Sequence, residues 1–153
     1  SMSMIHQKLY QGENLATIEM KDYFQQLGNY TMDVFNKRDK IIIEYQMDKL
    51  EIDVDIAIPI GLIVNELLTN ALKYAFPNGR NGKIMISLQR NMQKLKLDFR
   101  DNGIGKSTSY NLPESGFGTQ LIQLLTLQLD GRMTQNTREG TMISFEFQIP
   151  KAA

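Results

Sequence analysis

The sequence predicts an α/β fold, in which about three helices cover one face of a mixed, mostly antiparallel sheet to form a two-layer sandwich. Three segments have apolar residues at helical spacing, and they alternate with short segments that are typical of strands. Four of these strands come in two pairs joined by short turns, which favours antiparallel hairpins. The last strand, over 141–150, alternates apolar and polar side chains, so the sheet needs a cover on one face only.

The first half of the chain is expected to hold two helices and a strand. A broad apolar face predicts a helix over 17–37, and the β-branched run 41–46 predicts a strand. Residues 50–56 are expected to form a short extended link into a helix that begins near Pro59, because proline is favoured in the first turn of a helix. Apolar residues then recur at helical spacing through 58–76, which predicts a well-buried helix.

The second half of the chain is expected to contribute two hairpins and a helix. Its predicted elements are a turn, two strands, an amphipathic helix and two further strands, at 77–82, 83–90, 94–100, 120–129, 131–137 and 141–150. Strands that follow one another through such short turns pair antiparallel.

Composition describes one soluble globular domain. The chain has 153 residues, 42% of them hydrophobic and 22% charged. Its formal net charge is zero, so charge gives no case for nucleic acid or a membrane surface as a partner. The absence of cysteine excludes disulfides and thiolate metal sites, and it fits a reducing cytoplasm. The single histidine excludes a His-rich metal site. We find no signal peptide and no apolar run that approaches a membrane span.

The chain is expected to be a piece of a longer protein. Residues 1–4 resemble a cloning remnant placed before a chosen start. Any membrane anchor or sensing domain would lie outside the chain.

A purine site is indicated where the predicted strand 94–100 ends. The run Asp101-Asn102-Gly103-Ile104-Gly105 follows it directly. A carboxylate at a strand end can accept a hydrogen bond from an adenine amino group, and such a bond to a charged group contributes about 1.5–3 kcal/mol. The glycines would let the backbone approach a ligand closely. An ordinary turn is the alternative for this run taken alone.

Three polar residues form a stripe along the predicted helix 58–76. Glu66, Asn70 and Lys73 are spaced i, i+4, i+7 and therefore share one helix face. The oxygens of Glu66 and Asn70 suit Mg²⁺ or the waters around it, and Lys73 can offset phosphate charge. A solvated helix face is the alternative, although Asn65 and Asn70 are poor helix formers.

A third motif, Gly116-Phe117-Gly118-Thr119, precedes the predicted helix 120–129. Free backbone N–H groups and a positive dipole end at that point suit an anion, although a plain loop is the alternative. The polar residues 106–115 are expected to be a short lid over bound phosphates. A P-loop ending in Gly105-Lys106-Ser107 is excluded, because Arg100 occupies the position where that motif demands its first glycine.

In this order and spacing the motifs resemble the ATP-binding domain of sensor histidine kinases, in the GHKL superfamily that also includes gyrase, certain chaperones and mismatch-repair ATPases. The N box, the G1 box, the G2 box and the turn before the last strand are matched by residues 66–74, 101–105, 116–119 and 140–141. The resemblance covers about 58–150. The sequences of residues 5–10 and 57–62 are similar to those of the HisKA_2 subfamily, which has a short lid.

The resemblance implies a role for each of these positions. Asp101 would bind the adenine amino group, over a pocket floor shaped by Gly103 and Gly105 with Ile104 against the base. Asn70 would coordinate Mg²⁺. Lys73 and Tyr74 would contact phosphate or ribose, and Gly116, Gly118 and Thr119 would hold the phosphate end. Phe117 and Thr141 would also belong to the nucleotide-binding residues. Glu66 stands where gyrase-like ATPases carry a water-activating glutamate. In a kinase it would support Mg²⁺ or the incoming imidazole, and these alternatives stay open.

The resemblance also implies the function. Residues 13–150 would form the catalytic domain, which binds ATP and Mg²⁺, and residues 1–12 would include the end of an upstream dimerisation helix. The phosphoryl group would pass to a histidine on the absent helices and then to an aspartate of a response-regulator receiver domain. The domain would work in the cytoplasm, without nucleic acid. The full-length protein would be a homodimer, either soluble or anchored in a membrane.

His6, the one histidine, is expected to be structural, so the chain would not phosphorylate itself. The alternatives are a GHKL serine kinase of the anti-sigma type, an ATP hydrolase, or a nucleotide-dependent interaction module without catalysis.

Overall fold

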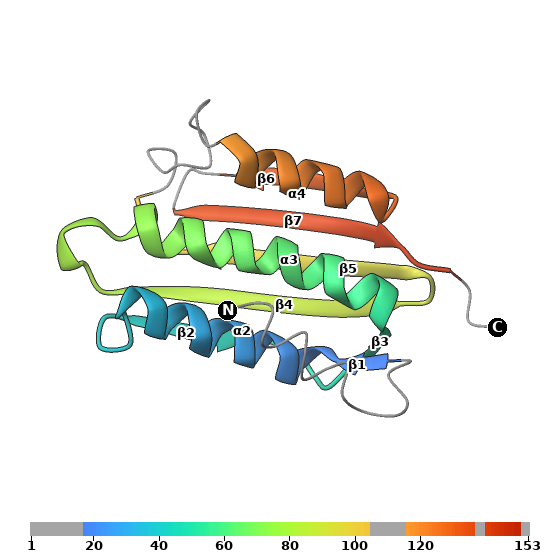
Figure 1. Cartoon of the computed structure of the whole chain (residues 1–153), viewed down its shortest axis with the longest axis horizontal. Coiled ribbons are helices and arrows are strands. Elements are labelled where there is room, and N and C mark those ends of the chain that lie inside the picture. The colour runs from blue at the N-terminus through green and yellow to red at the C-terminus, as the bar shows by residue number, and fades with distance from the viewer. Residues whose placement is uncertain (1–16, 105–115, 137–139, 151–153) are drawn as a thin grey trace.

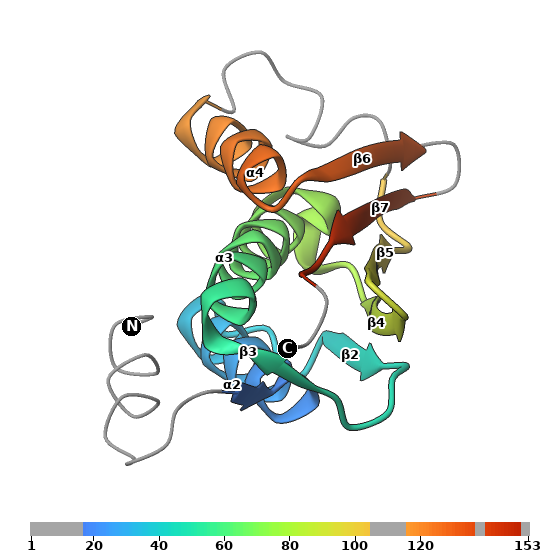
Figure 2. The same ribbon diagram turned by 90° about the vertical axis from the view of Figure 1, so that its right-hand side faces the viewer.

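In the computed structural model the described residues are 17–104, 116–136 and 140–150. They form a five-stranded sheet with three helices packed on one of its faces (Figure 1, Figure 2). In spatial order the strands are β2 (Ile41–Tyr45), β4 (Gly82–Asn91), β5 (Lys94–Asp101), β7 (Thr141–Gln148) and β6 (Gly131–Asn136). β2 runs parallel to β4, and the other neighbours are antiparallel. The predicted fold class is therefore confirmed.

The core lies between the sheet and its three helices. These are α2 (Met20–Phe35), α3 (Val54–Asn70) and α4 (Gly116–Gln128). Alternate residues of β5 and β7 are fully buried against them, and the rings of Phe145 and Phe147 stack with centroids 5.7 Å apart. The intervening residues lie on the opposite, open face. The alternation predicted for the last strand is thus confirmed, because one set of its side chains is buried and the other is partly or fully exposed.

The start of the first helix was predicted wrongly. Residues 17–19 form a strand, β1 (Thr17–Glu19), which pairs antiparallel with β3 (Glu51–Asp53) in a separate two-stranded sheet. The helix begins at Met20 because the carboxylate of Glu19 caps it, accepting hydrogen bonds from the N–H groups of Lys21 and Asp22. The two β-branched residues before the cap favour the strand.

The start of α3 was also predicted wrongly. The helix begins at Val54 instead of near Pro59, and Pro59 lies inside it. The proline removes one backbone hydrogen bond in the second turn. The helix tolerates this loss because the apolar residues around the proline, among them Ala57, Ile60 and Gly61, are buried in the core.

α3 ends in an unusual turn. The predicted helix 58–76 continues past Asn70 as a π-helix, η1 (Ala71–Ala75), before the short 3₁₀ turn η2 (Pro77–Gly79). Together Val54–Ala75 are long and apolar enough to cross a membrane, which the sequence reading did not anticipate. Half of the most apolar window is buried inside the protein, as expected for the core helix of a soluble domain.

The third helix begins earlier than predicted. α4 starts at Gly116 rather than at 120, so Gly116-Phe117-Gly118 form its first turn instead of a preceding loop. The predicted lid 106–115, Gly105, His6 and the turn at 137–139 lie outside the described residues.

Candidate functional site

Asp101 and Thr141 face each other at one end of the sheet. They are register partners in the last residue pair of β5 and β7, and their exposed fractions are 1% and 0%. Asp101 Oδ1 accepts the N–H of Gly103 at 2.9 Å. Thr141 Oγ1 is buried and has no hydrogen-bond partner within the described part of the chain. An unsatisfied buried polar group costs about 1–3 kcal/mol, which indicates that a ligand or a water bonds to it. A carboxylate beside a free hydroxyl fits the edge of a purine base.

The turn after Asp101 is packed onto the end of η1. The N–H of Ile104 donates to the carbonyl of Ala75 at 3.0 Å. A Cβ added to Gly103 would lie 2.3 Å from that carbonyl oxygen, so this position accepts no side chain. The side chain of Ile104 is 37% exposed beside this contact. The glycine is therefore required by the approach of the protein's own backbone.

Asn102 and Arg80 hold the same turn against β4, and sequence reasoning missed both. Asn102 Oδ1 accepts the N–H of Lys83 at 2.8 Å, and the N–H of Asn102 donates to the carbonyl of Lys83 at 3.2 Å. The Arg80 guanidinium donates to the carbonyl of Asn102 at 3.1 Å. The sequence signal for Asn102 is its position directly after a strand-end carboxylate, because asparagine side chains readily bond to nearby backbone groups.

The predicted polar stripe is present, with a change of pitch in its middle. Glu66 and Asn70 are half-buried on α3, whereas Lys73 and Tyr74 are exposed on η1. π-helical turns are wide and occur often at functional sites, and this one shifts the last two residues from their α-helical positions. Among the described residues, the side chains of Glu66, Asn70 and Lys73 make no hydrogen bond or ion pair with the protein, so they are available to a ligand.

The first turn of α4 completes the site. Figure 1 shows that the C-terminal end of α3, the end of β5 and the N-terminal end of α4 meet at the same end of the sandwich. The first N–H groups of any α-helix lack acceptors within the helix, so those of Gly116, Phe117 and Gly118 suit an anion. Thr119 is half-buried there. Nothing is described of the Phe117 side chain.

In the described part of the chain no three His, Cys, Asp or Glu residues lie close enough to hold a metal ion. Mg²⁺ is commonly held by one or two protein oxygens together with substrate phosphates, and Glu66 and Asn70 fit that arrangement.

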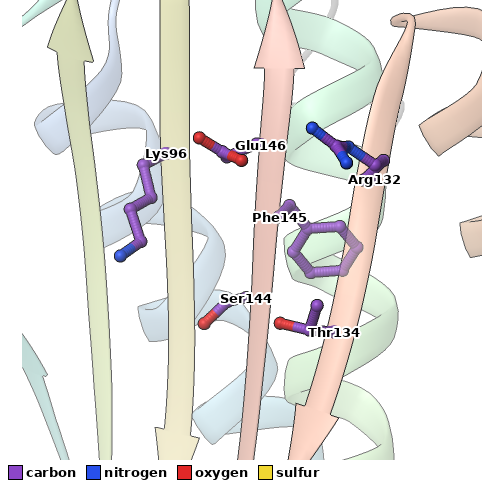
Figure 3. Close-up of a pocket in the computed structure, with 6 residues that line it drawn as sticks. All are labelled: Lys96, Arg132, Thr134, Ser144, Phe145 and Glu146. Carbon is purple, nitrogen blue, oxygen red and sulfur yellow. The ribbon is translucent and has the colours of Figure 1, made fainter.

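A hollow elsewhere on the molecule is not part of this site. It has a volume of about 380 Å³ and is lined by Lys96, Arg132, Thr134, Ser144, Phe145 and Glu146. Figure 3 shows it on the open face of the sheet, with the helices behind the strands. None of the predicted site residues lines it.

Comparison with known families assigns the chain to a family. The model of the histidine kinase-, DNA gyrase B- and HSP90-like ATPases matches residues 55–153, and a second model, described as histidine kinase (HisKA_2), matches residues 1–35. The chain belongs to the histidine kinase-, DNA gyrase B- and HSP90-like ATPase family, which implies that it binds ATP. The family and subfamily resemblance drawn from the sequence is confirmed.

Individual relatives agree with this. The chain is 29% identical over 153 residues to blue-light-activated histidine kinase 2 of Erythrobacter litoralis, covering 94% of this chain and 44% of the relative. It is 29% identical over 85 residues to sensor histidine kinase PdtaS of Mycobacterium tuberculosis, covering 54% and 17%. The chain thus spans less than half the length of these relatives.

Solved structures confirm the fold. The histidine kinase domain of the Erythrobacter litoralis EL346 blue-light-activated histidine kinase matches with a TM-score of 0.78 at 25% identity, over 92% of this chain and 70% of that chain. The mycobacterial sensor histidine kinase MprB matches with a TM-score of 0.65 at 20% identity, over 89% and 98%. The second likeness shows the fold alone.

Proposed function

We propose that this chain is the catalytic domain of a two-component sensor histidine kinase. In this proposal residues 13–150 form the domain, and residues 1–12 include the end of the dimerisation helices. An imidazole nitrogen on those helices takes the γ-phosphoryl group of ATP, and an aspartate of a response-regulator receiver domain takes it in turn. The observation that carries the proposal is the buried pair of Asp101 and Thr141, which lies at the same end of the sandwich as the polar stripe of α3.

The residues at this end of the sheet would bind the adenine base. Asp101 accepts from the adenine amino group while its Oδ1 is already oriented by the Gly103 N–H. Thr141 offers the one buried hydroxyl without a partner in the described residues, and it can bond to the base directly or through a water. Ile104 packs against the base, and Gly103 and Gly105 form the pocket floor.

The helix end would hold the phosphates. Asn70 would bind Mg²⁺, with Glu66 beside it directly or through water, and Lys73 and Tyr74 would contact phosphate or ribose. Gly116, Phe117, Gly118 and Thr119 would present N–H groups to the terminal phosphate. Mg²⁺ would supply charge neutralisation at the phosphate oxygens. Phosphoryl transfer requires mainly positioning and charge stabilisation, so these residues need no covalent chemistry of their own.

The partners follow from this proposal. The acceptor histidine lies on helices outside the described residues, the full-length protein works as a homodimer, and a receiver domain is the downstream partner. The domain would work in the cytoplasm, where ATP is available. The HisKA_2 match at residues 1–35 supports the attachment of dimerisation helices at this end of the chain.

Calorimetric titration with a non-hydrolysable ATP analogue tests the site. Asp101→Asn should weaken binding at least about tenfold, which corresponds to about 1.4 kcal/mol. Asp98→Asn is the matched control, because it makes the same change three residues earlier on β5, where Asp98 Oδ1 accepts from the Ser144 hydroxyl on the open face. Equal affinities for the two variants would remove the adenine assignment.

The same titration with and without Mg²⁺ tests the metal. Asn70→Ala should abolish the gain in affinity that Mg²⁺ gives the native chain. If the gain persists, Asn70 is not a ligand.

Transfer is tested by adding the missing acceptor. Radiolabelled ATP, the chain and a separate fragment carrying the dimerisation helices should give acid-labile, base-stable label on the fragment, as expected for phosphohistidine. Label on a serine would point to the anti-sigma type of kinase instead.

A further inference from the structure

Arg80 lies in the connection 76–81, which joins η1 to β4 and includes the turn η2. No residue of this connection has a role in the proposed function. Figure 1 shows the connection as a green loop at the end of the sandwich where η1 ends and β4 begins. The side chain of Arg80 nevertheless reaches the turn after Asp101, where it bonds to the backbone of Asn102, 22 positions later in the sequence.

The peptide group between Asn102 and Gly103 is hydrogen-bonded at both ends. Its carbonyl oxygen accepts from Nη2 of Arg80 at 3.1 Å, and its N–H donates to Oδ1 of Asp101 at 2.9 Å. A peptide group is planar, and its C=O and N–H point in opposite directions. Arg80 on one side and the carboxylate on the other are therefore joined through a single rigid group.

The residue before this peptide group is held by β4. The N–H of Asn102 donates to the carbonyl of Lys83 at 3.2 Å, and Asn102 Oδ1 accepts the N–H of Lys83 at 2.8 Å. These two bonds hold Asn102 itself, whereas the bond from Arg80 holds the peptide group that follows it. Arg80 thus adds to the turn a constraint that β4 does not supply.

The bond from Arg80 also strengthens the bond to the carboxylate. A guanidinium is always charged, and a cation at a carbonyl oxygen polarises the peptide group and makes its N–H a better donor. Asp101 is almost fully buried, so its carboxylate depends on such donors more than an exposed carboxylate does. The orientation of the Asp101 carboxylate is therefore sensitive to Arg80, although the two side chains lie on opposite sides of the peptide group.

We propose that Arg80 is a positioning residue for adenine binding, acting through the Asn102–Gly103 peptide group on the carboxylate of Asp101. The inference rests on the proposed function, in which that carboxylate accepts a hydrogen bond from the adenine amino group. Arg80 itself needs no contact with the nucleotide. Its loss should weaken the contact with the amino group and leave the binding of the phosphates unchanged. A merely structural role would instead affect the binding of the whole nucleotide.

Calorimetric titration with ATP and with purine riboside triphosphate separates these two roles. The second nucleotide lacks the 6-amino group and keeps the rest of ATP, so the ratio of the two dissociation constants reports the amino-group contact alone. The native chain should prefer ATP at least about tenfold. Arg80→Ala should reduce this preference by about threefold. Partial unfolding of the variant would weaken both nucleotides equally and leave the ratio unchanged.

Arg90→Ala is the matched control. Arg90 is also exposed, and its Nε donates to a backbone carbonyl, that of Met92, at 3.0 Å. It lies near the opposite end of β4, so its replacement should keep the native preference for ATP. Arg80→Lys retains a charged donor and should recover most of the preference. If Arg80→Ala keeps the native preference, or if Arg90→Ala lowers it as much, the inference is wrong.

A double variant tests the route through the carboxylate. Asp101→Asn already removes the favourable contact with the amino group, so adding Arg80→Ala to it should weaken ATP binding no further. A further threefold loss would show that Arg80 acts on another part of the nucleotide, and would overturn the inference. A native chain that binds neither nucleotide, or binds both equally, contradicts the adenine assignment itself, and the inference fails with it. A native chain that prefers ATP, together with an Arg80→Ala chain that prefers it equally, refutes the role of Arg80 alone.

Discussion

Glu19 joins three chain segments through one carboxylate, so its replacement by glutamine should lower stability in a pH-dependent way. Its oxygens accept the N–H groups of Lys21, Asp22 and Leu50 at 2.9, 3.2 and 3.1 Å. Burial of Glu19 opposes its ionisation, but the three hydrogen bonds outweigh this and lower the pKa of the carboxyl. The charged form is therefore the one that the fold stabilises.

The expected loss follows from these contacts. A hydrogen bond to a charged group contributes about 1.5–3 kcal/mol, and a helix N-cap about 1 kcal/mol. Glu19 is partly exposed, so water replaces some of this, and glutamine keeps one acceptor oxygen. We expect Glu19→Gln to lower the free energy of unfolding by about 1.5–2 kcal/mol at neutral pH.

The sign of the pH dependence can be stated in advance. The folded pKa lies below the unfolded one, near 4.5, so the contribution is complete above the unfolded pKa and is lost as the pH falls through the folded pKa. Urea unfolding of both proteins at neutral pH and at about pH 3 should therefore give a difference that shrinks in acid. A difference that stays constant between the two pH values would refute the ionic origin, and one near zero throughout would refute the role of the cap.

Two further predictions concern buried contacts between elements. In Gly61→Ala the new Cβ would lie 2.2 Å from Tyr23 Oη and 2.5 Å from two ring carbons, between α3 and α2. We expect urea unfolding to show a net loss of about 1–2 kcal/mol, because strain exceeds the helix propensity that alanine gains, and unchanged stability would contradict this. Burial raises the pKa of Tyr45 to about 12 from its ordinary 10.0, so the stability of the native chain should fall relative to Tyr45→Phe as the pH rises through this window. Unfolding of both proteins at about pH 9 and about pH 11 measures this difference in stability. A difference that is the same at the two pH values would show that the phenol is not buried.

The fold was predictable where hydrophobic periodicity dominates. Both hairpins of the main sheet and the open polar face follow from alternation that packing preserves. The errors lie at element starts, where one side chain or tertiary contact decides. The carboxylate of Glu19 caps a helix that begins at Met20, so residues 17–19 are left to form a strand. Around Pro59, burial of the helix face outweighs the usual preference of proline for a first turn.

The candidate site was predictable in its residue types but not in its connections. The stripe and the strand-end carboxylate are local patterns, so spacing alone indicated them. The partner of Asp101 depends on the β5–β7 register, which no local pattern contains. The π-helical turn that repositions Lys73 and Tyr74 has no sequence signal that we can identify. Arg80 and Asn102 were missed because their bonds go to backbone atoms.

The glycines at the site fix positions as much as they admit a ligand. Gly140 has φ +76°, and a Cβ there would lie 2.1 Å from the carbonyl oxygen of Asp101. Gly103 makes the equivalent approach to the carbonyl of Ala75. Both contacts join backbone to backbone, so neither can be relieved by a side-chain rotation. The segment that carries Asp101 is thereby held between the end of η1 and the start of β7, and the same two contacts that place the carboxylate beside Thr141 also fix its distance from the polar stripe of α3.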